Sequence, residues 1–227
     1  MSKGLIIPPK IDEKFFLFFT TKSFIYKPLE FIKDTFNRDF LLYMPVQKHT
    51  DLVIDVDINT TKKEIVADAV ITKEVGLFVG VKTADCVPIL IIDEVKSVVS
   101  AIHAGWRGIA QSILSNTVKK MINKYDCKIS NLKAFIGPGI KMCCYAVKED
   151  VFLKIKNSSG DGNYFIENGG SYFVDLQKAN REQLLNLGIK DIWIAEYCTC
   201  CNQDDFHSYR RDKDKALRQY AIVGIKR

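Results

Sequence analysis

The stretch VPILIIDEVKSVVSAIHAGWRGI, residues 87–109, decides the fold class of this chain of 227 residues. Residues 87–92 form a continuous apolar run, as expected for a strand that is covered on both faces. A second strand, residues 97–102, leads directly into His103, and apolar residues at helical spacing then continue to about Tyr125. This succession predicts an α/β protein in which His103 lies at a strand-to-helix turn. Such turns commonly bind anions or carry catalytic groups, because the N-terminus of a helix is positive.

The same mixture of elements extends over most of the chain. Several strands in the first half have no helix between them, which favours a mixed β-sheet with helices on both faces over a clean Rossmann fold. The length suits a single domain spanning residues 1–227. Strands are predicted at residues 15–20, 41–46, 52–56, 67–72, 76–81, 132–136, 172–174, 192–195 and 219–225, and helices at residues 28–36, 147–155 and 175–187.

Composition and charge narrow the possible functions. Hydrophobic residues make up 47% and charged residues 26%, which are ordinary values for a globular protein. The net charge of +6 is small and scattered, so we expect no binding to nucleic acid. We recognise neither a secretion signal nor an apolar segment near the roughly 20 residues that span a bilayer. We therefore expect a cytoplasmic protein without a membrane partner, in which the seven cysteines remain thiols.

Three residues are candidates for a metal site. His49, Cys86 and His103 each stand beside the end of a predicted strand. If the strands that follow Cys86 and precede His103 are antiparallel neighbours, both side chains come to the same end of the sheet. Imidazole and thiolate are ligands that zinc prefers, and a catalytic zinc keeps a fourth position open. The spacing alone leaves the alternative that Cys86 is an ordinary core residue.

Charged residues near these candidates suggest further roles. Asp85 is a candidate to move a proton or orient a ligand, and its alternative role is to cap a turn. Arg107, in the first turn of the helix, suits a phosphate or carboxylate; a salt bridge there is the alternative, which the helix dipole disfavours. Arg210 and Arg211 are candidates for phosphate binding, or else form a surface pair bridged to Asp212 or Asp214.

The remaining cysteines give a weaker signal. Cys198, Cys200 and Cys201, with His207 nearby, could form a structural zinc site, but we favour a thiol cluster in the core because the spacing fits no common zinc knuckle. Cys143 and Cys144 are adjacent and would point opposite ways in an extended chain. A metal shared by those two thiols is therefore not expected.

Several segments, taken together, resemble one known family. They are QKH (47–49), TADCVP (83–88), HAGWRG (103–108), GPGI (137–140) leading to Cys144-Tyr145, and CT (198–199) leading to FHSYRRD (206–212). From about residue 40 to the C-terminus the chain is similar to the YfiH family, which is described variously as a laccase-like multicopper polyphenol oxidoreductase, a peptidoglycan editing factor and a purine nucleoside phosphorylase. One departure is visible, because the Thr-Gly-Arg that often follows the Arg-Arg-Asp segment reads Lys215 to Arg218 here.

The resemblance implies a single α/β domain related to the catalytic fold of cytotoxic necrotizing factor. It implies one zinc ion held by two histidines and one cysteine, which fall on His49, Cys86 and His103. It also implies phosphorolysis of adenosine, inosine, guanosine and methylthioadenosine, and deamination of adenosine. Gln47, Arg107, Arg210 and Arg211 are then the expected substrate-binding residues, with Asp85 and Arg107 as catalytic candidates. The expected partners are purine nucleosides and phosphate, in a monomer or a homodimer.

Two other functions stay open at this point. A copper-dependent polyphenol oxidase could use one copper at the same site, but three histidines cannot supply the roughly ten that multicopper laccases use. A hydrolase acting on peptidoglycan precursors could use Cys86 as nucleophile and His103 as base. A purely binding module is disfavoured, because nothing structural requires three ligand-type residues to converge.

Overall fold

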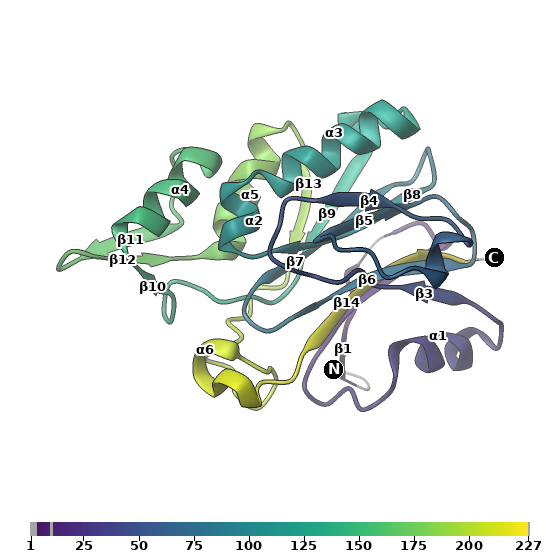
Figure 1. The fold of residues 1–227 in the computed structure, drawn as a ribbon, viewed down its shortest axis with the longest axis horizontal. Coiled ribbons are helices and arrows are strands. Elements are labelled where there is room, and N and C mark those ends of the chain that lie inside the picture. Colours follow the sequence, from purple (N-terminus) through teal and green to yellow (C-terminus); the bar gives the residue numbers. More distant parts are fainter. Residues whose placement is uncertain (1–3, 10, 227) are drawn as a thin grey trace.

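Two stacked β-sheets form the centre of the molecule in this computed structural model, which describes residues 4–9 and 11–226 (Figure 1). The smaller of the two has the strand order β1-β2-β14-β6-β3 and the larger has the order β13-β9-β7-β8-β5-β4. A third, short sheet has the order β10-β12-β11. The strands are β1 (Leu5–Ile6), β2 (Phe15–Thr20), β3 (Leu41–Tyr43), β4 (Val53–Asp55), β5 (Ala69–Thr72), β6 (Leu77–Thr83), β7 (Val87–Asp93), β8 (Val98–Ala104), β9 (Leu132–Ile136), β10 (Ala146–Val147), β11 (Phe165–Asn168), β12 (Ser171–Val174), β13 (Asp191–Ile194) and β14 (Gln219–Ile225).

The apolar run of β7 is buried on both of its faces, as its sequence predicts. Leu90 and Ile92 point into the core between the two sheets. Ile89 and Ile91 point to the other side of the larger sheet, into the core beneath the helices. Successive side chains of a strand face opposite ways, so a strand in the middle layer of the molecule has to be apolar throughout.

Helices cover the outer faces of both sheets (Figure 1). Helices α2 (Trp106–Ala110), α3 (Ile113–Tyr125), α4 (Glu149–Ser159) and α5 (Leu176–Asn186) contribute to the core on the larger sheet. Helix α1 (Pro28–Phe36) packs Phe31 and Ile32 against the smaller sheet. The mixed α/β class with helices on both faces is thus confirmed, but the strands form two stacked sheets where one mixed sheet was expected.

The helix predicted after His103 is divided into two. Helix α2 ends at Ala110 and α3 begins at Ile113. Ser112 between them has a φ of 61°, in the left-handed region that interrupts a right-handed helix. The break leaves α2 as a short separate helix whose first residue follows Gly105, directly beside the end of β8. The short helix α6 (Tyr209–Asp212) and the strands β1, β10 and β11 were not predicted from the sequence.

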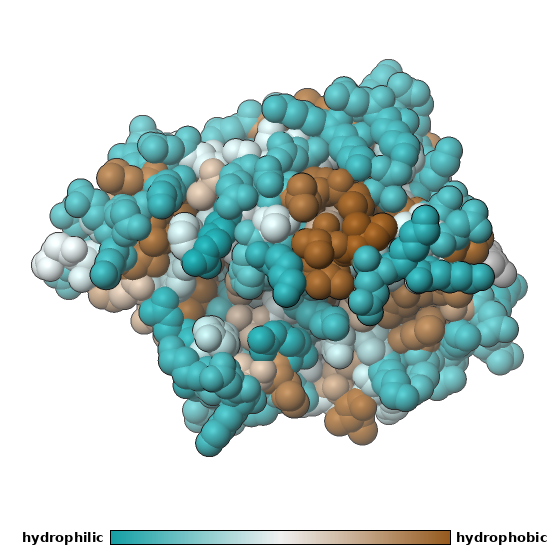
Figure 2. All heavy atoms as spheres, viewed as in Figure 1, coloured by the Kyte–Doolittle hydropathy of each residue, from teal (hydrophilic) through white to brown (hydrophobic). Residues whose placement is uncertain are grey.

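The surface adds two observations. Figure 2 shows a largely hydrophilic face on which a group of apolar side chains gathers near β4. Leu52 and Ile58, which lie on either side of β4 in the chain, are about half exposed, at 50% and 46%. Within the part of the chain that the structure describes, no helix is both long and apolar enough to cross a membrane.

Candidate metal centre

His49, Cys86 and His103 converge at one end of the larger sheet. Their ligand atoms all lie within 4.8 Å of one another, and Cys86 Sγ is 3.8 Å from His49 Nε2. Strands β7 and β8 are antiparallel, with Pro88 opposite His103, so the predicted approach of Cys86 and His103 is confirmed. Two imidazoles and one thiol form a donor set that fits a catalytic zinc with an open fourth position. That they bind a metal stays a prediction.

One buried carboxylate, that of Asp68, organises two of the three candidate ligands. Its side chain accepts backbone hydrogen bonds from Lys48 (3.1 Å), His49 (3.0 Å) and Thr50 (2.7 Å). It also accepts the Thr50 hydroxyl at 2.8 Å and His103 Nδ1 at 2.7 Å. The same residue therefore fixes the loop that carries His49 and the ring of His103.

The contact with Asp68 fixes the tautomer of His103. An ionised carboxylate only accepts hydrogen bonds, so Nδ1 carries the proton and Nε2 is left for a metal. Burial alone would raise the pKa of Asp68, but hydrogen bonds from His103 and Thr50 hold it well below its usual range. A carboxylate that positions a histidine in this way is a recurrent feature of metal sites.

Cys86 and His103 also influence each other electrostatically. Burial by itself would raise the pKa of the Cys86 thiol, but the charge of His103 and hydrogen bonds from both histidines lower that pKa to about 6. Burial would lower the pKa of His103, but the Cys86 thiolate and Asp68 raise it to about 9. The pair therefore favours a thiolate, which is the form of cysteine that binds metals and acts as a nucleophile.

The backbone leaves room for the ligands at Gly105. A Cβ at this position would lie 2.8 Å from Cys86 Sγ and 3.4 Å from a ring carbon of His49. The φ of Gly105 is −77°, which any residue can adopt, so the glycine is required by the close approach of the two side chains and not by the backbone conformation.

Asp85 is placed beside the centre but is heavily engaged. Its buried carboxylate accepts the hydroxyls of Thr199 (2.7 Å) and Ser208 (3.1 Å) and the backbone N–H of Arg210 (2.6 Å). These contacts tie the C-terminal segment of the chain to the residue that precedes Cys86. They indicate a positioning role, and proton transfer by Asp85 stays a prediction.

The two arginines of α6 that were predicted to bind phosphate differ in how many of their guanidinium donors are already hydrogen-bonded. The guanidinium of Arg211 donates two hydrogen bonds to Asp212 and one each to the carbonyls of Thr199, Cys200 and Phe206. Those five bonds use the full donor capacity of a guanidinium, so Arg211 supports the fold of this segment. The predicted alternative, a bridge to Asp212, is present.

Arg210 and Arg107 are better placed to meet an anion. The guanidinium of Arg210 lies 4.9 Å from the ring centre of Tyr145 and makes only long contacts, 3.4 Å each, to the carbonyl of Ala146. Arg107 is exposed and stacks on Trp106 at 4.5 Å. Both guanidinium groups have N–H donors from which a phosphate could accept hydrogen bonds.

Gln47 holds the loop that carries His49 in place. Its amide accepts the N–H of Lys82 at 2.9 Å and donates to the carbonyl of Lys82 at 2.8 Å. This pair of bonds joins the segment before His49 to β6. Both ends of the amide are engaged, so substrate binding by Gln47 stays a prediction.

The roles of Asp68 and Tyr145 were not predicted from the sequence. Burial, followed by the charge of Cys86, raises the pKa of Tyr145 well above its usual range, while Arg210 and Arg107 act to lower it. Tyr145 therefore belongs to the electrostatic surroundings of both the thiol and the two arginines. A lone aspartate in the apolar segment 67–72 was the available signal for Asp68, since a buried charge needs partners.

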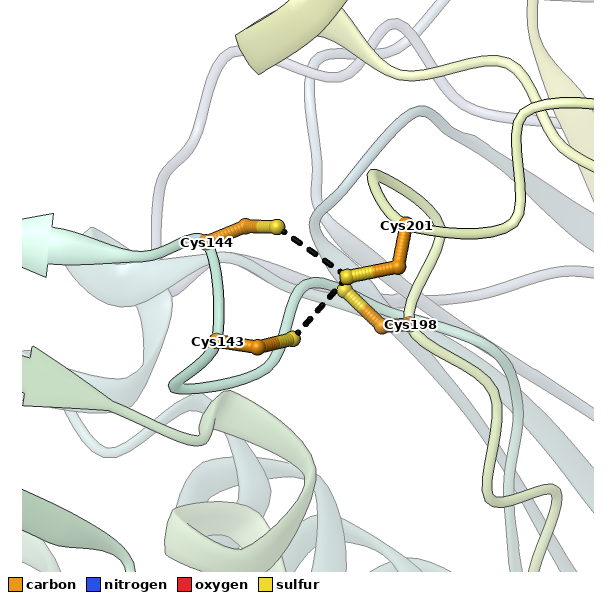
Figure 3. Close-up of side chains that lie close together, drawn as sticks. All are labelled: Cys143, Cys144, Cys198 and Cys201. Atoms are coloured by element: carbon orange, nitrogen blue, oxygen red, sulfur yellow. Dashed lines mark hydrogen bonds between the residues drawn. The ribbon is translucent and has the colours of Figure 1, made fainter.

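Four cysteines form a second group of ligand-type side chains, which shares no residue with the first. The sulfur atoms of Cys143, Cys144, Cys198 and Cys201 all lie within 4.8 Å of one another (Figure 3). The expectation that Cys143 and Cys144 point apart is wrong, because both lie in a turn and not in an extended strand. His207 is not among the four.

Comparisons with known proteins agree with this fold. The sequence model of a family described as "Multi-copper polyphenol oxidoreductase laccase" matches residues 31–226. The purine nucleoside phosphorylase of Aquifex aeolicus is 37% identical over 182 residues, which cover 80% of this chain and 82% of that protein. A purine nucleoside phosphorylase of Clostridium acetobutylicum is 31% identical over 226 residues, covering 93% and 92%. The crystal structure of the Bacillus licheniformis hypothetical protein YfiH has a TM-score of 0.88 at 27% identity, covering 99% and 97%.

Proposed function

This chain belongs to the YfiH family, whose sequence model is described as a multi-copper polyphenol oxidoreductase laccase, and we propose that it is a zinc-dependent purine nucleoside phosphorylase that also deaminates adenosine. The observation that carries the proposal is the convergence of His49, Cys86 and His103 within 4.8 Å. Arg210 lies 4.9 Å from the ring centre of Tyr145, and the charges of Arg210, Arg107 and Cys86 all act on the pKa of that tyrosine. Relatives that share most of the chain are named purine nucleoside phosphorylases, which supports the choice of substrate.

The proposed substrates are adenosine, inosine, guanosine and methylthioadenosine, together with phosphate. In phosphorolysis a phosphate oxygen forms a bond to the anomeric carbon of the sugar while the bond to the base nitrogen breaks. The electron pair of that bond stays on the base, which takes up a proton, and the sugar 1-phosphate is released. In deamination, water adds its oxygen to C6 of adenosine and the amino group leaves as ammonia, giving inosine.

The charged residues near the candidate metal centre are proposed to have different roles in these reactions. Arg107 and Arg210 are proposed to bind the phosphate, because their guanidinium groups are charged and keep donors free. Asp85 is proposed to keep Arg210 in place through the backbone N–H that it accepts at 2.6 Å. Asp68 keeps the proton of His103 on Nδ1, away from the centre.

The donor set fits zinc better than a multicopper centre. A zinc ion bound by His49, Cys86 and His103 would supply Lewis-acid chemistry at the open position. A trinuclear oxygen-reducing copper centre requires more histidines than the three in this sequence. A single copper ion at the same three ligands is the remaining form of the oxidase alternative, and metal analysis of the purified protein separates it from zinc.

The experiment follows adenosine by chromatography, with and without phosphate and with and without a chelator. We expect adenine to form only with phosphate and inosine to form without it, and both products to disappear after metal removal and return with zinc. Absence of turnover of all four nucleosides by zinc-replete protein would reject the proposal. Copper-dependent oxidation of a phenol, or metal-independent hydrolysis of a peptidoglycan precursor, would instead support the two alternatives.

Substitutions test the role of the arginines. We expect Arg210→Ala to raise the KM for phosphate by about tenfold or more, since a hydrogen bond to a charged group contributes about 1.5–3 kcal/mol. Arg181→Ala is the matched control, because Arg181 lies on α5 and pairs with Glu182. An unchanged KM for phosphate in the Arg210 variant would remove this residue from the proposed anion site.

A further inference from the structure

The four-cysteine group lies where two loops meet. Cys143 and Cys144 belong to the turn that follows the Gly-Pro-Gly segment after β9, and Cys198 and Cys201 belong to the loop that follows β13. The two loops are joined by a parallel bridge between Gly139 and Cys198. Figure 3 shows all four side chains directed toward the same space between the loops.

The distances suit a single small ion. Cys201 Sγ lies 3.2 Å from the sulfurs of both Cys143 and Cys144. Four sulfurs bound tetrahedrally at about 2.3 Å from a zinc ion are about 3.8 Å apart, and all four sulfurs here lie within 4.8 Å of one another. Small movements of side chains in exposed turns would complete the tetrahedron.

The local chemistry also suits thiolates. Cys198 and Cys201 are separated by two residues, which is the ligand spacing found in structural zinc sites. Arg211, bonded to the carbonyl of Cys200 at 2.9 Å, adds positive charge beside the group.

We propose that Cys143, Cys144, Cys198 and Cys201 bind a second metal ion, a structural zinc, separate from the ion at His49, Cys86 and His103. Four thiolates close the coordination sphere, so this ion has no open position and no catalytic role. It joins the loop that leads into Tyr145 to the loop that carries Thr199, the partner of Asp85. The ion thus stabilises the side of the molecule against which Arg210 packs.

The main test counts metal ions in the full-length protein, purified under reducing, oxygen-free conditions with zinc and then freed of loosely bound zinc. We expect two zinc ions per chain for the wild type and one for Cys198→Ser or Cys201→Ser. Cys86→Ser should also hold one, and the variant with both Cys86→Ser and Cys198→Ser should hold none. Cys200→Ser is the matched control, from the same loop, and should hold two.

A wild type with one zinc that Cys86→Ser abolishes would overturn the proposal. So would retention of both ions by Cys198→Ser and Cys201→Ser, or loss of one ion in Cys200→Ser. Cobalt substitution adds a spectroscopic readout: Cys86→Ser should retain the intense thiolate-to-cobalt absorption of a four-sulfur site, and the variant that also carries Cys198→Ser should lose it.

A measurement on the wild type alone keeps the test valid if a variant fails to fold. Cys143 and Cys201 are exposed, so both should react quickly with an alkylating reagent when no metal protects them. We expect zinc to slow their alkylation at least about tenfold, and a chelator to restore it. Fast alkylation in the presence of zinc, or a mass lower by two hydrogens that shows a disulfide between these loops, would overturn the proposal.

Discussion

Asp68→Asn is the substitution that most directly tests how the fold positions the candidate metal ligands. It changes one oxygen of the carboxylate into an amino group and hardly alters volume. The carboxylate accepts five hydrogen bonds, two at Oδ1 from His49 N–H and His103 Nδ1 and three at Oδ2 from Lys48 and Thr50. An amide can accept at only one end, so the variant must give up one of the two sets.

Either orientation of the asparagine has a defined cost. If its oxygen faces His103, the backbone N–H groups of Lys48 and Thr50 lose their acceptor. If its nitrogen faces His103, the imidazole must accept at Nδ1 and carry its proton on Nε2, which is then unable to bind metal. Each of these two partly buried N–H groups, once without its acceptor, costs up to about 1–3 kcal/mol in the free energy of unfolding. Loss of a carboxylate that orients a metal-bound histidine typically lowers metal affinity about 10- to 100-fold, or about 1.4–2.8 kcal/mol.

Two assays separate the effects on folding and on the metal. Zinc affinity is measured by competition with a chromophoric chelator, and stability by urea unfolding of the metal-free and zinc-loaded proteins. Asp93→Asn is the matched control: Asp93 is a buried aspartate at the far end of β7, and its Oδ1 accepts the N–H groups of Val95 and Lys96. We expect that control to keep the zinc affinity of the wild type. A folded Asp68→Asn protein that binds zinc within about twofold of the wild type would refute the reasoning.

Two further substitutions test other parts of the structure. Gly105→Ala should weaken zinc binding by about tenfold or more while the protein stays folded, because the new methyl group would lie 2.8 Å from Cys86 Sγ; unchanged affinity in the same competition assay would contradict the close approach. Asp55→Asn should lower the free energy of unfolding by about 1 kcal/mol at neutral pH, because Asp55 pairs with Lys120 and Lys124 on α3. Burial acts to raise the pKa of Asp55, but the two lysines outweigh it and lower that pKa, so the stabilisation is present above the ordinary carboxyl pKa and disappears as the pH falls through the lowered value. Urea unfolding at pH 7 and near pH 3 measures the difference, and a loss of equal size at both pH values would contradict the assignment to this ion pair.

Local pattern predicted most of the individual elements. Strands β2, β9 and β14 and helix α1 begin and end at the predicted residues, because each is a short apolar or amphipathic run bounded by turn or capping residues. The arrangement into two sheets was not predictable in this way. Strand β14 pairs with both β2 and β6, and these partners lie far away in the sequence, so no local period records the pairing.

The candidate site was predicted in part. Residue type and proximity to strand ends identified Cys86 and His103, and the antiparallel pairing of β7 and β8 brings them together as expected. The four-cysteine group was not predicted, because the convergence of Cys143 and Cys144 depends on a turn. Side chains alternate between opposite faces only in an extended strand, so that alternation does not describe the turn at Cys143 and Cys144.

The buried carboxylates of Asp68 and Asp85 contact different parts of the candidate metal centre. Asp68 contacts the loop of His49 and the ring of His103, so it acts on the ligands themselves. Asp85 precedes Cys86 in the chain and has a φ of 84°. Its carboxylate accepts hydrogen bonds from the C-terminal segment that carries Arg210. We therefore expect loss of the first carboxylate to change metal affinity. Loss of the second should change the position of the proposed anion-binding side while leaving the three candidate ligand side chains with their own contacts. Metal content and phosphate affinity should for this reason respond separately to changes at the two aspartates.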